Sequence, residues 1–302
     1  PAPAPAKVPA ASAKVSAAGA GAKTEPKSDE KEKIPPPVEL KGNELLTSDG
    51  VALRATFYPG TKGKESAVVV LLHSSKGDRK EYATLAPFLQ QRGHAVLVPD
   101  LRGFGESTQV SVNGRVKELD GGKFKPADYE AMVYEDMETF KRFLVRQNDE
   151  GLLNVNKLCV VGAEMGASVA LNWAKLDWSW PVLGGGLKQG QDVKGLVLIS
   201  PKWLFPGLSA NEALSDPAVR SQLSLLIVVG KEDRQAAAET KRIYKAVWRD
   251  QSELAPDKKD LFFGEFPTKL QGAKMLGVKG LNVEGYVAQF IELRLVRQDY
   301  PW

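Results

Sequence analysis

The 302-residue sequence predicts an α/β fold, with a mostly parallel, twisted sheet of about eight strands flanked by helices. Continuous apolar runs such as Ala67–Leu72 and Ala95–Val98 are typical of strands that are covered on both faces. Segments with helical periodicity lie between these runs, and the longest is expected from about Asp128 to Arg146. Because strands and helices alternate along the chain, the strands are expected to be joined by crossover connections and to be parallel.

The individual elements follow from local patterns. The first two strands are expected at 39–47 and 51–58, joined by a tight turn at Ser48-Asp49-Gly50. A strand at 67–72, a helix over 82–89 and a strand at 95–98 come next. Further strands are expected at 158–161, 195–199, 225–229 and 261–266, and further helices at 128–146, from Met165, near 235–248 and near 283–296.

Residues 1–37 differ in composition from the rest of the chain, because they hold eight of its nineteen prolines and almost no large apolar side chains. Such a segment cannot bury enough surface to offset its chain entropy, so a disordered tether is expected there. One folded domain is expected over 38–302. The chain begins with Pro1 rather than methionine, which favours a secreted or periplasmic protein that has lost a signal peptide.

Composition excludes several classes of function. The formal net charge is only +4 and the basic residues are scattered, so no nucleic-acid interface is predicted. No apolar stretch reaches the length of about 18 residues that a membrane-spanning helix needs. Cys159 is the only cysteine, and the two histidines, His73 and His94, lie far from any ligand-like spacing. We therefore expect no disulfide, no metal site and no cofactor.

Three short motifs follow the ends of predicted strands. They are Leu71-Leu72-His73-Ser74-Ser75, the D-x-R-G-x-G-x-S string within 98–107, and Gly162-Ala163-Glu164-Met165-Gly166, which leads into a helix. With these motifs the chain resembles the α/β-hydrolase superfamily from about Val38 to Leu295, and its dienelactone-hydrolase-like and serine-esterase-like members in particular. The resemblance implies that the third motif is the nucleophile elbow, a strained strand-to-helix turn that normally reads G-x-S-x-G.

The same resemblance implies a degenerate catalytic triad. Glu164 stands where the nucleophilic serine is expected, and Gln271 stands where the histidine base is expected. Asp233 matches the position of the acid after the seventh strand.

The surroundings of the triad look retained. Gly162 and Gly166 are the elbow glycines, and the backbone N–H groups of Ser75 and Met165 correspond to the oxyanion hole. Glu164 is expected to accept hydrogen bonds from these two N–H groups, and Gln271 to bridge Glu164 and Asp233.

These substitutions predict a catalytically inactive hydrolase-fold protein, because glutamine cannot take a proton from a nucleophile. The expected role is binding or scaffolding, with a small-molecule or protein ligand at the degenerate pocket. Two alternatives stay open, a weak ester hydrolase and an enzyme that uses the Glu164 carboxylate as its nucleophile. The short stretch from Ser200 to the strand near Ser224 leaves no room for a large cap domain, so any pocket is expected to be shallow or open.

Overall fold

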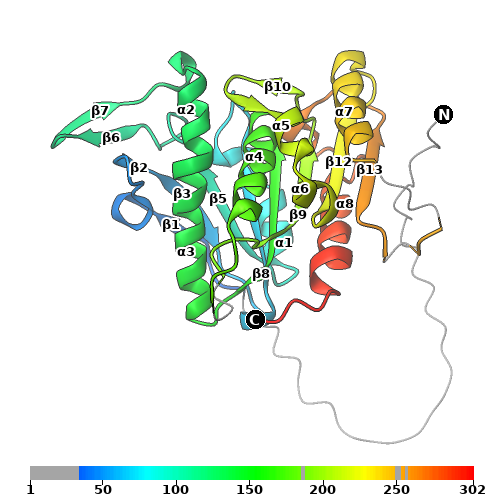
Figure 1. The fold of residues 1–302 in the computed structure, drawn as a ribbon, viewed down its shortest axis with the longest axis horizontal. Coiled ribbons are helices and arrows are strands. Elements are labelled where there is room, and N and C mark those ends of the chain that lie inside the picture. The colour runs from blue at the N-terminus through cyan, green and yellow to red at the C-terminus, as the bar shows by residue number, and fades with distance from the viewer. Residues whose placement is uncertain (1–33, 185–187, 249–252, 256–257) are drawn as a thin grey trace, which may run out of the picture.

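The computed structural model describes residues 34–184, 188–248, 253–255 and 258–302. Its main sheet has eight strands in the order β1-β3-β5-β4-β8-β9-β12-β13 (Figure 1). Strand β3 is antiparallel to both of its neighbours, and all the pairs from β5 to β13 are parallel. The predicted mostly parallel sheet is therefore confirmed. The strands of this sheet are β1 (Val38–Leu40), β3 (Arg54–Tyr58), β4 (Ala67–Leu72), β5 (Ala95–Asp100), β8 (Asn154–Ala163), β9 (Val193–Ile199), β12 (Ser224–Gly230) and β13 (Leu261–Phe266).

Helices cover both faces of the sheet. One face packs against α1 and α8, and the other packs against α3, α4 and α7, which lie in front of the sheet in Figure 1. The helices are α1 (Leu85–Gln90), α2 (Pro126–Ala131), α3 (Met137–Asp149), α4 (Met165–Ser179), α5 (Ala210–Ser215), α6 (Pro217–Ser221), α7 (Arg234–Ala246) and α8 (Val283–Ile291). Among the described residues, no helix combines the length and the apolar character needed to cross a membrane.

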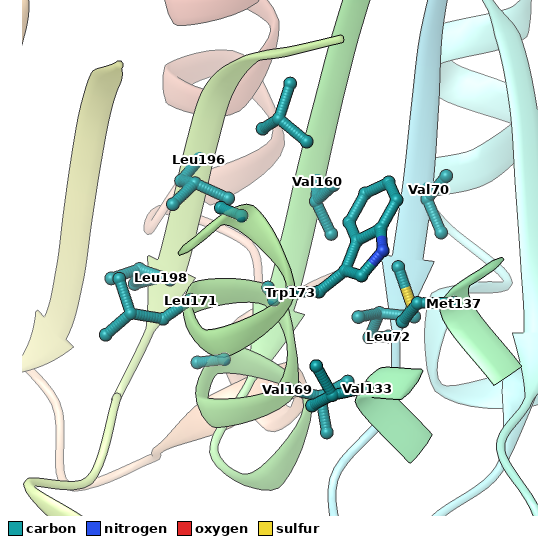
Figure 2. Close-up of a cluster of buried hydrophobic side chains, with 14 of the residues drawn as sticks. Val70, Leu72, Val133, Met137, Val160, Val169, Leu171, Trp173, Leu196 and Leu198 are labelled. Carbon is teal, nitrogen blue, oxygen red and sulfur yellow. The ribbon is translucent and has the colours of Figure 1, made fainter. Parts of the chain in front are cut away.

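The central strands are apolar throughout because each face of the sheet is buried. Val70 and Leu72 of β4 belong to the core on one face, whereas Val69 and Leu71 belong to the core on the other. Figure 2 shows how α4 packs on the first of these faces, with the indole of Trp173 against β4 and β8. Such packing fixes the position of α4 relative to the ends of the two central strands.

The loop that follows β5 and carries the D-x-R-G-x-G-x-S motif is held in place by the buried charged side chains of Asp100 and Arg102. The Asp100 carboxylate accepts hydrogen bonds from the backbone N–H groups of Arg79 (2.8 Å) and Glu106 (2.9 Å). The Arg102 guanidinium forms an ion pair with Asp136, with 2.8 Å between Nε and Oδ1. Burial raises the pKa of Asp136 to about 6, although the charge of Arg102 opposes this shift. Asp136 lies in a π-helical turn, Met132–Asp136, which joins α2 to α3 within the single helix predicted for 128–146.

Two regions differ from the sequence-based expectation. The strand expected at 39–47 is short, because the chain turns at Gly42, which has a φ of +49°, into a 3-10 helix over Gly42–Leu45. The sequence analysis also missed a hairpin formed by β6 (Gln109–Val112) and β7 (Arg115–Glu118), which pairs with β2 (Val51–Ala52). This hairpin projects beside α2 (Figure 1).

The connection between β9 and β12 contains only β10 (Leu204–Phe205), β11 (Leu208–Ser209) and the short helices α5 and α6. A large cap domain is therefore absent from this connection, as expected. The predicted disordered tether, residues 1–37, lies outside the described residues except for residues 34–37. Within that short piece, the carbonyl of Pro35 accepts a hydrogen bond from Gln90 Nε2 at 2.9 Å.

Candidate functional site

The turn between β8 and α4 has strained backbone at Glu164. Its φ is +48° and its ψ is −102°, a conformation that a non-glycine residue adopts only at an energetic cost. The turn is held by its neighbours, because the Glu164 N–H donates to the carbonyl of Ile199 at 3.0 Å. This is the geometry expected of a nucleophile elbow, in which one side chain is presented at the carboxyl edge of the sheet.

The two elbow glycines are needed for a close approach of backbones. A Cβ atom on Gly162 would lie 2.3 Å from the carbonyl of Gly166. A Cβ atom on Gly166 would lie 2.1 Å from the carbonyl oxygen of Leu72, at the end of β4. The first turn of α4 can therefore pack against β4 only because both positions lack a side chain.

The loop after β4 is rigidly held next to the elbow. His73 Nδ1 donates to the carbonyl of Ser74 at 2.7 Å, and His73 Nε2 accepts from the Leu101 N–H at 3.0 Å. Burial lowers the pKa of His73, so the imidazole is neutral and serves as a structural link. The next amide, that of Ser75, donates no hydrogen bond to a described residue, and the same is true of the Met165 amide.

The Glu164 carboxylate accepts no hydrogen bond from the N–H groups of Ser75 and Met165. Its side chain is half-buried and packs against Gly272, where a Cβ atom would lie 3.0 Å from Glu164 Cγ. Within the described part of the chain, the carboxylate has neither a hydrogen bond nor an ion pair. The expected hydrogen bonds from Ser75 and Met165 are therefore wrong, because the side chain is directed to the loop after β13 instead.

Gln271 is fixed by three hydrogen bonds that use both ends of its amide. Nε2 donates to the carbonyl of Gly230 at 2.8 Å. Oε1 accepts from Ser200 Oγ at 2.6 Å and from the Gly230 N–H at 3.4 Å. The expected bridge between Glu164 and Asp233 is therefore wrong, because the Gln271 amide is hydrogen-bonded to Gly230 and Ser200 and makes no hydrogen bond to either carboxylate.

Asp233 caps α7. One carboxylate oxygen, Oδ1, accepts hydrogen bonds from the N–H groups of Gln235 and Ala236, both at 3.1 Å. This N-terminal cap holds the side chain in place and satisfies two amides that have no partner within the helix. The other oxygen, Oδ2, accepts no hydrogen bond from a described residue.

The three triad positions meet at one cavity of about 190 Å³, which we name the triad cavity. It lies at the carboxyl ends of β8, β9 and β12, where open α/β sheets commonly bind ligands. Its lining includes Glu164, Ser200, Lys202, Asp233, Glu239 and Gln271. Ser75 and Met165 do not line it.

Comparison with known proteins agrees with this architecture. A family model described as serine aminopeptidase, S33, matches residues 63–207. The fold is similar to that of a dienelactone hydrolase from Anabaena variabilis, with a TM-score of 0.57, 17% identity and coverage of 86% of this chain and 99% of that chain. The chain is an α/β-hydrolase-fold protein.

Two further solved structures resemble this hydrolase-fold protein. A Pyrococcus furiosus esterase matches with a TM-score of 0.55 and 17% identity over 86% of this chain and 93% of that chain. The α/β hydrolase GrgF from a Penicillium species matches with a TM-score of 0.55 and 13% identity over 86% of this chain and 99% of that chain. No curated protein matches by sequence.

Sequence reasoning missed Ser200, which organises the site of this hydrolase-fold protein. Its φ is +51°, and its hydroxyl donates to Gln271 and accepts from the Gly272 N–H at 2.9 Å. One signal was present in the sequence, since Ser200 directly follows a predicted strand and precedes Pro201.

Neither of the two histidines lies at the triad cavity. His73 is buried beneath the loop after β4, and both of its ring nitrogens are engaged. His94 precedes β5 at the opposite edge of the sheet, where burial lowers its pKa to about 4. Neither residue lines the triad cavity.

Because Gly166 lies so close to the backbone of Leu72, adding a single methyl group at this position should strongly lower the stability of the fold. Gly166→Ala should lower the free energy of unfolding by about 2 kcal/mol or more, because the new Cβ meets backbone that cannot move freely. Gly184→Ala is the matched control, since a Cβ there would meet nothing within 4 Å. Urea unfolding of both variants measures the difference, and equal losses would contradict the packing described above.

Proposed function

We propose that this hydrolase-fold protein is catalytically inactive as a serine hydrolase and that it uses the triad cavity for binding. The observation that carries the proposal is the state of Gln271. This side chain has no titratable group near neutral pH, and it is hydrogen-bonded to Ser200 and Gly230 rather than to Glu164. The residue that should accept a proton is thus both chemically unable to do so and immobilised.

The absence of a serine and a histidine from the triad positions is expected to lower kcat by a large factor. Removal of either the serine or the histidine from a serine protease lowers kcat by about a millionfold. Both residue types are missing from the triad positions of this chain, at Glu164 and Gln271. What the fold keeps is a rigid elbow and a cavity, which are sufficient for binding a small molecule or a protein side chain.

A panel of p-nitrophenyl and aliphatic esters tests this proposal. Purified wild-type protein should show no multiple turnover above the uncatalysed rate, because the cavity offers neither a serine at the elbow nor a histidine to activate a nucleophile. The measurement is the steady-state rate of product release at several protein concentrations.

Glu164→Ala, purified in parallel, controls for contaminating esterases, which would contribute equally to both preparations. Turnover in the wild-type protein that Glu164→Ala or Gln271→Ala abolishes would reveal an ester hydrolase and refute the proposal.

A second candidate function rests on the free carboxylate of Glu164. This group lies at the elbow without a hydrogen-bond partner among the described residues, as an attacking nucleophile would. Its oxygen would displace halide from a haloalkane, forming a glutamyl ester and releasing the halide ion. The ester would persist, because no histidine is present in the cavity to activate water for its hydrolysis.

This second function predicts one alkyl group per chain after incubation with a primary bromoalkane. Intact-mass measurement detects the adduct, and peptide mapping should place it on Glu164. Glu164→Gln removes the nucleophile and is expected to stay unmodified. A wild-type chain whose mass does not change would exclude the carboxylate-nucleophile function.

A further inference from the structure

The loop after β13 packs closely against the end of β12. The Glu232 N–H donates to the carbonyl of Thr268, in the first part of the loop, at 3.1 Å. The last part of the loop lies against Gly230, where a Cβ atom would be 2.2 Å from the carbonyl oxygen of Leu270. Backbone therefore meets backbone along this contact, which a side chain at Gly230 would prevent.

The end of β9 places Ser200 between this loop and the elbow. The preceding residue, Ile199, accepts a hydrogen bond from the Glu164 N–H at 3.0 Å, and the Ser200 N–H donates to the carbonyl of Val228 at 2.7 Å. Ser200 is buried, and its φ of +51° costs energy for a residue other than glycine. Its hydroxyl is therefore held between the ends of β8 and β12.

The Ser200 hydroxyl uses both of its hydrogen-bonding roles toward the loop. It donates to Gln271 Oε1 at 2.6 Å and accepts from the Gly272 N–H at 2.9 Å. A hydroxyl can donate and accept at the same time, so one group here holds two successive residues. Because Gly272 is buried, loss of the hydroxyl would leave its N–H without this acceptor, at a cost in free energy.

Gly272 carries this contact to the elbow. Its φ is +57°, and a Cβ atom there would lie 3.0 Å from Glu164 Cγ and 3.3 Å from Glu164 Cδ. Only glycine combines this backbone conformation with so close a contact. The backbone of Gly272 therefore covers one side of the half-buried Glu164 side chain.

From these contacts we infer that Ser200 is a positioning residue, whose hydroxyl holds Gln271 and Gly272 over the side chain at position 164 and limits access to it. We name the two hydrogen bonds of Ser200 to Gln271 and Gly272 the Ser200 latch. Since Glu164 lines the triad cavity, the latch sets how far a ligand reaches into it. The inference rests on the proposed binding function and specifies how access to that site is controlled.

Thiol labelling tests the Ser200 latch. Glu164→Cys places a reporter thiol at the elbow, whereas Cys159, the only native cysteine, is fully buried and burial raises its pKa. Addition of Ser200→Ala to this variant should raise the rate of labelling by iodoacetamide at position 164 by about tenfold, because the loop opens more often without the two hydrogen bonds. Intact-mass measurement gives the rate, and peptide mapping assigns the labelled thiol.

Cys159 separates local opening from a general loss of stability. It lies in β8 within the buried core, so it becomes accessible only when the core opens. The latch predicts faster labelling at position 164 while Cys159 stays unlabelled. Ser215→Ala is the matched control, because it removes a hydroxyl that donates to the carbonyl of Glu212 in α5 and should leave both rates unchanged.

Amide hydrogen exchange gives a second measurement with Glu164 in place. Ser200→Ala alone should accelerate exchange in residues 268–273 by about tenfold and leave exchange in the central strands unchanged, because the Gly272 N–H loses its acceptor. Gln271→Leu keeps the approximate size of the side chain but removes its hydrogen bonds, so it should act in the same direction.

The inference is overturned if Ser200→Ala leaves the labelling rate at position 164 unchanged, or if Cys159 is labelled as fast as position 164. If Glu164→Cys fails to fold, unchanged exchange in residues 268–273 of Ser200→Ala overturns it instead. Ester turnover by the wild-type protein would refute the proposed function whatever these rates are. Unchanged rates in a protein that also lacks turnover would refute the latch alone.

Discussion

The contact between the first turn of α4 and the end of β4 is the constraint on which the site depends. Gly162 and Gly166 allow the backbones to meet, and the packing of Trp173 holds the helix in place. With the helix fixed, the residue at the corner must adopt a positive φ and present its side chain at the edge of the sheet. The strained conformation of Glu164 is thus a consequence of packing that is independent of the chemistry of its side chain.

Because the backbone of the elbow does not depend on the side chain at position 164, the fold can be kept when the residues of the site change. The elbow and the loop after β4 keep the backbone form of the hydrolase fold, and the proposed inactivity rests only on the side chains of Glu164 and Gln271. Gln271 is held by three hydrogen bonds to Ser200 and Gly230, and Asp233 caps α7. These two side chains are therefore held in place without a serine or a histidine at the triad positions.

The parts that could be predicted from the sequence are those set by burial and backbone geometry. Strands β4 and β13 begin and end where expected, because apolar runs covered on both faces have few other solutions. The hairpin of β6 and β7 was missed although Asn113-Gly114, both with positive φ, is a strong turn signal. The direction of Glu164 could not be predicted, because this side chain packs against Gly272, which is distant in the chain. The direction of Gln271 could not be predicted either, because its partners Ser200 and Gly230 come from other loops.

The central claim is that only proton-transferring groups separate this scaffold from a working hydrolase. The most direct measurement is ester hydrolysis by the double variant Glu164→Ser with Gln271→His, beside each single variant and the wild type. The account predicts turnover in the double variant and none in the other three proteins, because a nucleophile and its base act as a unit. Equal rates in all of them would contradict it.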